Sequence, residues 1–206
     1  MTAPFEVNQI ISAQPRPAVI GGVASSGSVR WAPQGTPYPE NSVDPLDDDF
    51  ISLGRVHPMG IHRDELREVS DHFDWGGSLI AVLQPRYTLA VNFTLMQVMN
   101  PGVQKAAHGQ ANVVYEKATT EHGNRFTTYL NPEILDTGVW CFNVFYRGVT
   151  GRLVMPYARP VQVVGPSWTQ REIATFNLTV KAMPNDTNTY AFEYWDDGAR
   201  LLPPTP

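Results

Sequence analysis

Apolar and polar residues alternate over several short stretches of this chain, and a period of two is typical of β-strands. The clearest stretch covers residues 87–98, where large apolar residues alternate with smaller or polar ones. We expect the apolar set to lie in the core, and it comprises Leu89, Val91, Phe93 and Leu95. Similar stretches cover residues 139–147, 171–182 and 189–195. The patterns predict about eight to ten short strands with one or two short helices, arranged as a β-sandwich or barrel.

Two stretches carry helical signals. Leu66, Val69 and Phe73 stand at i, i+3 and i+7 in the most charged part of the chain, which fits one face of a short amphipathic helix. An exposed strand pair fits the same residues, and the pattern is too short to decide between the two. Farther along, Asn100-Pro101 is a good helix start and Gly109 a good stop, so a short helix is expected between them.

Residues 33–49 show neither period. The segment holds four prolines and an acidic run, and it exceeds the usual length of a connection. It is either a flexible surface excursion or a segment that orders on a partner, and the pattern leaves both open. Prolines also concentrate near the two ends, so we expect an N-terminal arm at 1–17, one domain over 18–198 and a C-terminal arm at 199–206.

The amino-acid composition suggests that the protein contacts other subunits. Only 17% of the 206 residues are charged, against roughly 25% in an average domain, which suggests surface shared with other subunits. The net charge is −5 without a Lys/Arg cluster, so no binding to a nucleic-acid backbone is expected. The sequence shows no apolar run long enough for a membrane span and no signal peptide. We therefore expect a protein made in the cytoplasm that does not contact a membrane.

No catalytic, cofactor or metal site is expected. The sequence contains no phosphate-binding glycine loop, no G-x-S-x-G elbow and no H-E-x-x-H pair. The spacing of His57 and His62 fits no common metal site, and the acids of residues 44–49 do not follow the EF-hand pattern. The single cysteine, Cys141, excludes an internal disulfide and sits between aromatic residues, as a buried small hydrophobe would. These observations predict a protein that is not an enzyme.

The order of several motifs resembles a known family. Met59-Gly60-Ile61 precedes a charged stretch ending in Trp75-Gly76-Gly77, and the strand at 87–98 leads into Asn100-Pro101 and the helix closed by Gly109. Residues 159–182 then precede the turn Pro184-Asn185-Asp186. Over roughly residues 50–195 this order resembles the major tail protein, or tail tube subunit, of long non-contractile-tailed bacteriophages (siphophages), especially those of actinobacterial hosts. The family strand often ends in Leu-Glu, and here that place reads Met96-Gln97.

The resemblance implies a mainly β, tail-tube-like sandwich or partial barrel with one or two flanking helices, a long stacking loop and terminal arms. Such subunits form hexameric rings that stack into a tube in the virion tail, through which genomic DNA passes without sequence-specific binding. The implied partners are further copies of the chain and the tail terminator, distal tail and tape measure proteins. The 33–49 loop becomes the candidate inter-ring loop, ordering only on assembly.

Two groups of residues follow from that reading. The residues assigned to the inter-ring loop are Trp31, Tyr38, Asp44, Asp47, Asp48 and Asp49. Those assigned to a lumen or inter-subunit strand face are Thr88, Asn92, Thr94 and Gln97. The alternative is a β-sandwich binding module, such as a capsid decoration or carbohydrate-binding virion protein, which would stay monomeric or form a small oligomer.

Overall fold

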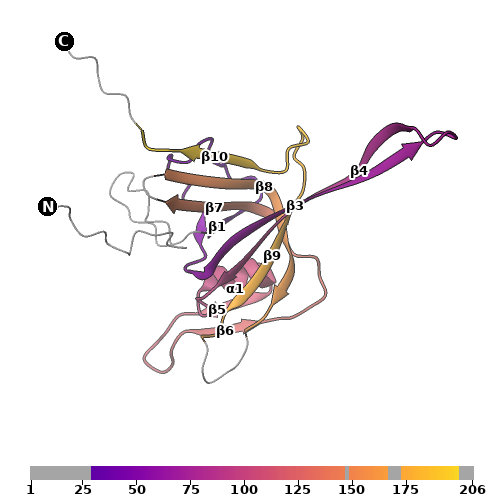
Figure 1. Ribbon diagram of the computed structural model, residues 1–206. Helices are drawn as coiled ribbons and strands as arrows, with labels where there is room; N and C mark the ends of the chain where they lie inside the picture. The colour runs from indigo at the N-terminus through magenta and orange to yellow at the C-terminus, as the bar shows by residue number, and fades with distance from the viewer. Residues whose placement is uncertain (1–28, 147–148, 167–172, 200–206) are drawn as a thin grey trace, which may run out of the picture.

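The computed structural model describes residues 29–146, 149–166 and 173–199 (Figure 1). The expected N-terminal arm and all but the first residue of the expected C-terminal arm lie outside these residues. The described part contains one helix, α1 (Pro101–His108), and ten strands. The strands are β1 (Val29–Pro33), β2 (Ile51–Ser52), β3 (Val56–Phe73), β4 (Leu79–Leu95), β5 (Val113–Glu116), β6 (Arg125–Thr128), β7 (Gly138–Tyr146), β8 (Val149–Val164), β9 (Phe176–Ala182) and β10 (Phe192–Asp196).

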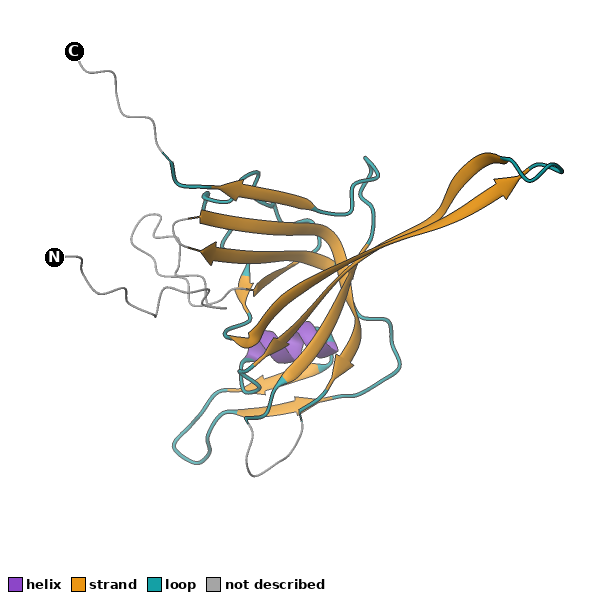
Figure 2. Cartoon of the chain, in the orientation of Figure 1, coloured by secondary structure: helices purple, strands orange, loops and turns teal. Residues whose placement is uncertain are grey.

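One antiparallel sheet contains all but two of these strands. Its order is β2-β1-β7-β8-β9-β4-β3, with β10 also paired to β8. The first half of β8 pairs with β10 and its second half with β9, so the sheet divides along this long strand. Strands β5 and β6 form a separate hairpin near α1 (Figure 2). The prediction of a mainly β chain is confirmed.

The core lies where this sheet curls over itself. Phe93 on β4 contacts Trp140 and Phe142 on β7, with ring centroids 6.0 Å and 5.3 Å apart, although β9 and β8 separate the two strands in the sheet. Val103 on α1 is buried in the same cluster, so the helix covers part of the curled sheet. This arrangement agrees with a partial barrel. The four apolar residues expected in the core from the strand at 87–98 are at most 3% exposed, so that prediction is confirmed.

The expected helix at residues 100–109 is also confirmed. The Asn100 side chain accepts a hydrogen bond from the Gly102 backbone N–H at 2.8 Å, as a cap does. Gly109 ends the helix with a φ of 90°, a conformation that favours glycine. No helix among the described residues is long and apolar enough to cross a membrane.

Of the two alternatives for residues 62–73, the strand pair is correct. These residues belong to β3, which pairs with β4 from Val56↔Leu95 to Phe73↔Leu79. The apolar positions that suggested a helix face are exposed on this ribbon, so no core contact favoured a helix. Strand β4 begins earlier than expected, because it continues through Pro85. A register shift between Glu68 and Ser70 places this proline at an irregularity, where the loss of an N–H is tolerated.

Candidate assembly site

The outer part of the β3–β4 hairpin has no third strand beside it. Strand β9 pairs with β4 only from Ala90 to Leu95. Residues 66–88, called the arm here, therefore extend from the body as a two-stranded ribbon (Figures 1 and 2). A two-stranded ribbon is marginally stable in water by itself. The arm therefore needs a partner surface to be a firm structural element.

The arm carries a dense set of exposed apolar side chains. Each is more than half exposed, and they are Leu66, Val69, Phe73, Trp75, Leu79, Ile80, Val82 and Leu83. Exposed apolar side chains gathered on one element, unlike single scattered ones, mark interaction sites. On this criterion the arm is the strongest candidate for a binding surface in the described part of the chain.

The tip of the arm is an ordered turn. The Asp74 carboxylate accepts a hydrogen bond from the Ser78 N–H at 2.8 Å, and the Asp74 carbonyl accepts one from the Gly77 N–H at 3.1 Å. Gly77 has a φ of 82°, which a residue with a side chain rarely adopts. Trp75 stands in this turn and is fully exposed. The turn thus presents an indole to solvent on a defined backbone.

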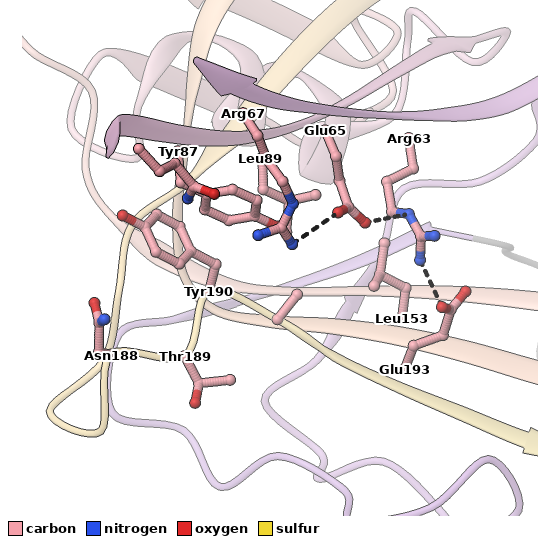
Figure 3. Close-up of a pocket in the computed structure, with 12 residues that line it drawn as sticks. Arg63, Glu65, Arg67, Tyr87, Leu89, Leu153, Asn188, Thr189, Tyr190 and Glu193 are labelled. Atoms are coloured by element: carbon pink, nitrogen blue, oxygen red, sulfur yellow. Dashed lines mark hydrogen bonds and ion pairs between the residues drawn. The ribbon is translucent and has the colours of Figure 1, made fainter. Parts of the chain in front are cut away.

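A pocket of about 530 Å³ lies at the root of the arm, between β3, β4 and the segment before β10 (Figure 3). The rings of Tyr87 and Tyr190 meet edge to face at 4.8 Å, and the Arg67 guanidinium lies 4.7 Å from the centre of the Tyr87 ring. Burial, followed by the nearby Glu65 carboxylate, raises the pKa of Tyr87. Tyr87 therefore stays a neutral aromatic wall of the pocket at physiological pH.

Ion pairs tie the root of the arm to the body. Arg63 on β3 bonds Glu193 on β10 at 2.5 Å and Glu65 at 3.3 Å, and Arg67 lies 3.7 Å from Glu65 (Figure 3). The hydrogen bond to Glu193, partly offset by burial, raises the pKa of Arg63. The contact between Arg63 and Glu193 joins two strands that are not neighbours in the sheet, so it links the root of the arm to β10.

Of the residues assigned to a strand face, Asn92 and Thr94 are on the side of β4 that faces away from the core. The Asn92 amide donates to Asp64 and accepts from the Thr179 hydroxyl at 2.6 Å, and Thr94 accepts from Asn177 at 3.1 Å. These contacts make a polar surface across β3, β4 and β9. Whether it lines a lumen stays a prediction.

The other two members of that group do not join this surface. Thr88 pairs with Leu66 on the arm. Gln97 is exposed and lies beyond the end of β4. Its side chain packs against Gly54, and a Cβ added at Gly54 would lie 2.0 Å from the Gln97 side-chain oxygen. Placing Gln97 on the strand was wrong, because the strand ends at Leu95.

The 33–49 loop is attached to its own chain. The Arg152 side chain on β8 donates to the backbone carbonyls of Asn41 and Asp44 at 2.9 Å and 2.8 Å. The Ser42 hydroxyl lies 3.4 Å from that of Thr150. The expectation that this loop orders only on assembly is corrected by these contacts, since the chain itself supplies the loop's anchors. An inter-ring role for its outer face stays a prediction.

The residues assigned to that loop separate into different environments. Trp31 is 3% exposed in β1 and belongs to the core, so its assignment to the loop surface was wrong. Tyr38 stacks on Phe192 with ring centroids 5.8 Å apart. Asp44 accepts from the Asn41 amide, and Asp47 accepts from the Asp49 N–H. Asp48 is exposed, like the other three acids, so they form the solvent side of the loop.

The described residues offer little chemistry. They contain no group of three or more His, Cys, Asp or Glu side chains that could hold a metal ion. Cys141 is fully buried, and burial raises the pKa of its thiol to about 12. A thiol that stays protonated is a poor nucleophile, so Cys141 is not placed for nucleophilic chemistry.

The exposed strand pair was one of the two expectations for residues 62–73, but its projection as an arm and the pocket at its root were not predicted. A signal was present in the apolar run at residues 79–83, which follows a charged strand and a Gly-Gly turn. That combination is typical of a hairpin. Nothing in the pattern showed that a strand over this run would leave the body.

No protein-family model matches the sequence, and no curated protein matches it. Among solved structures, a chain of the PVC sheath–tube complex in its extended state, from an extracellular contractile injection system, is 10% identical with a TM-score of 0.38, covering 85% of this chain and 93% of that one. A chain of the anti-feeding prophage cap is 8% identical with a TM-score of 0.40, covering 82% and 89%. A chain of the anti-feeding prophage baseplate is 13% identical with a TM-score of 0.39, covering 87% and 99%. At such TM-scores the likeness carries no functional argument, so the function rests on the geometry described above.

Proposed function

We propose that this chain is a structural subunit that assembles with copies of itself into stacked hexameric rings, as a tail tube of the siphophage type. The observation that carries the proposal is the arm at residues 66–88, a ribbon whose apolar side chains have no partner in the described part of the chain. A second copy is the partner that every copy always has available. Head-to-tail contacts between copies generate rings or helical stacks.

The ends of the sheet support the same proposal. Strand β3 is eighteen residues long and stands last in the sheet order, so one of its edges offers unpaired N–H and C=O groups. Soluble proteins usually shorten, charge or cover such an edge. Here the edge strand carries charges such as Arg63 and Glu65, but it is not short, and it continues into the apolar arm. A ring of subunits would pair or cover it.

The polar surface of β3, β4 and β9 is our candidate for the wall of a DNA conduit. Asn92, Thr94 and Thr179 present amides and hydroxyls rather than clustered cations, and such a surface would let a polyanion slide past. In purified tubes, Asn92→Lys or Thr94→Lys should change the charge of the lumen and slow DNA passage while rings stay intact. Unchanged passage through tubes carrying both substitutions would remove this surface from the lumen.

The wider setting belongs to the proposal as well. A tail tube subunit acts in the virion tail after synthesis in the host cytoplasm, and it has no enzymatic role. Its partners would be the tail terminator, distal tail and tape measure proteins. The sequence resemblance over residues 50–195 supports this setting, together with the exposed arm.

The test compares the unaltered chain with a variant whose arm is polar. In the variant, Val69, Phe73, Leu79 and Val82 are each changed to Thr, which keeps strand propensity and touches no core residue. We expect rings or tubes from the unaltered chain by negative-stain microscopy, and monomers with the same circular dichroism from the variant. The matched control is Leu130→Thr with Ile134→Thr, two exposed apolar residues outside the arm. Compact monomers of the unaltered chain at high concentration would refute the proposal and favour the binding-module alternative.

A further inference from the structure

The tip of the arm and the pocket at its root are complementary in chemistry. We propose that Trp75 of one copy inserts into the pocket lined by Tyr87, Tyr190, Leu89 and Arg67 of a second copy. This inference rests on the self-assembly proposed above and names the contact through which it acts. Each copy then donates one indole and offers one pocket.

The two features cannot meet within one chain. Trp75 lies eight positions beyond Arg67 along the same antiparallel ribbon. At roughly 3.3 Å per residue, the tip is about 26 Å from the pocket. The ribbon is extended, and the Arg63 contact to Glu193 holds its root against β10. The occupant must therefore come from another copy.

The pocket suits an aromatic side chain. Its volume of about 530 Å³ exceeds what one indole needs, which leaves room for part of the turn that carries it. Tyr87 and Tyr190, which meet edge to face, supply an aromatic wall, and Leu89 contributes an apolar wall at the point where the arm enters the body (Figure 3). The Arg67 guanidinium lies over Tyr87 and is more than half exposed, so an arriving indole can also stack on a cation.

Charge agrees with this pairing. Residues 71–77 of the tip contain Asp71 and Asp74 and no Lys or Arg. In the pocket, Arg63 contacts both Glu65 and Glu193, while Arg67 makes a longer ion pair, 3.7 Å to Glu65. An acidic tip that delivers Trp75 would therefore bring a carboxylate close to Arg67.

The predicted contact is directional. Where one copy uses its tip and the next uses its pocket, the interface is heterologous and leaves a free tip and a free pocket at the ends of every open chain of copies. Such a contact closes into a ring or continues as a helix. Two copies that exchange tips reciprocally would instead close a two-fold dimer, and cross-linking that stops at the dimer would overturn the directional contact.

Cross-linking tests the contact while Trp75 stays in place. Gly76→Cys is tolerated at the tip, because a Cβ there would meet only the Asp74 side chain at 3.4 Å. Thr189→Cys places a second thiol at the rim of the pocket. The native Cys141 is fully buried and does not compete. Under mild oxidation the double variant should give a ladder of linked multimers, each single variant should give none, and adding Trp75→Ala should abolish the ladder.

Assembly thresholds give a second readout. Trp75→Ala and Tyr190→Ala should each raise the concentration at which assembly begins by about thirtyfold or more, as hot-spot truncations do. The double variant should raise this threshold little more than either substitution alone. If the two residues acted independently, their effects would multiply to about 900-fold. Ile134→Ala, an exposed apolar residue outside the arm, should leave the threshold unchanged.

The outcomes separate this inference from the proposed function. Assembly of the double variant without a ladder, or a ladder that survives Trp75→Ala, overturns the Trp75 contact but not the assembly. Linking by Gly76→Cys alone shows that tips meet tips, which also overturns it. Failure of the unaltered chain to assemble overturns the proposed function itself.

Discussion

Arg152 is expected to hold the 33–49 loop on the body, and replacing it with Ala tests this directly. Its side chain is 6% exposed and donates three hydrogen bonds, to the carbonyls of Asn41 and Asp44 and to the Asn143 side chain at 2.7 Å. Burial lowers the pKa of Arg152, although arginine stays charged in proteins. A buried cation with three partners is therefore what joins the loop to β8.

The magnitude follows from those bonds. A hydrogen bond from a charged donor contributes about 1.5–3 kcal/mol, so three of them contribute at least about 4.5 kcal/mol. Removing the cation also removes its desolvation cost, and the two loop carbonyls regain water when the loop detaches. We expect Arg152→Ala to lower the free energy of unfolding by about 3 kcal/mol. Arg152→Lys keeps the charge but not the planar fork, and should cost about 1–2 kcal/mol.

Urea unfolding and hydrogen exchange measure the two parts of this effect. Unfolding followed by tryptophan fluorescence gives the global loss, and amide exchange at residues 36–44 reports whether the loop has opened. Arg159→Ala is the control, since Arg159 is a half-buried arginine farther along β8. It should change stability by less than about 0.5 kcal/mol. A loss below about 1 kcal/mol in Arg152→Ala, with loop amides still protected, would refute the role given to this side chain.

Three further outcomes are expected. Gly138→Ala should lower stability by about 2 kcal/mol in thermal unfolding, because the added Cβ would lie 2.3 Å from the Trp31 indole nitrogen. Asn100→Ala should cost about 1 kcal/mol in urea, since it removes the cap from the Gly102 N–H. Cys141 should resist thiol reagents until the chain unfolds. Because folding raises its pKa from 9.0 to about 12, its contribution to stability is complete below pH 9 and falls as pH rises toward 12, which unfolding of Cys141→Ala at several pH values can check.

Periodicity predicted the body well because each strand there has one buried face and one exposed face, so apolar and polar residues alternate along it. The alternation from Leu89 to Leu95 is matched by Phe176, Leu178 and Val180 on the neighbouring β9, so pattern and packing agree. Helix α1 could also be predicted, because the residues that start and end it act through local backbone chemistry.

The arm could not be predicted in the same way. Its strand pairing is local, but no core selects one face, so the spacing of Leu66, Val69 and Phe73 suggested a helix as readily as a strand. The attachment of the 33–49 loop to the body could not be predicted for a different reason. Its main anchor, Arg152, stands more than a hundred residues away, and no periodicity in the loop reports a distant cation.

The body and the arm are stabilised by different means, and that difference separates a self-sufficient fold from a surface that needs a partner. The body buries its apolar residues within one chain, closed by contacts such as Phe93 against Trp140. The arm repeats strand pairing without burial and ends in an exposed indole, so the free energy that would make it firm is available only when the arm meets a partner surface. A binding module would need its apolar surface for a foreign partner and would tend to limit self-contact. A chain that carries both an aromatic tip and an aromatic pocket, on opposite ends of one ribbon, is better suited to adding copies of itself in one direction.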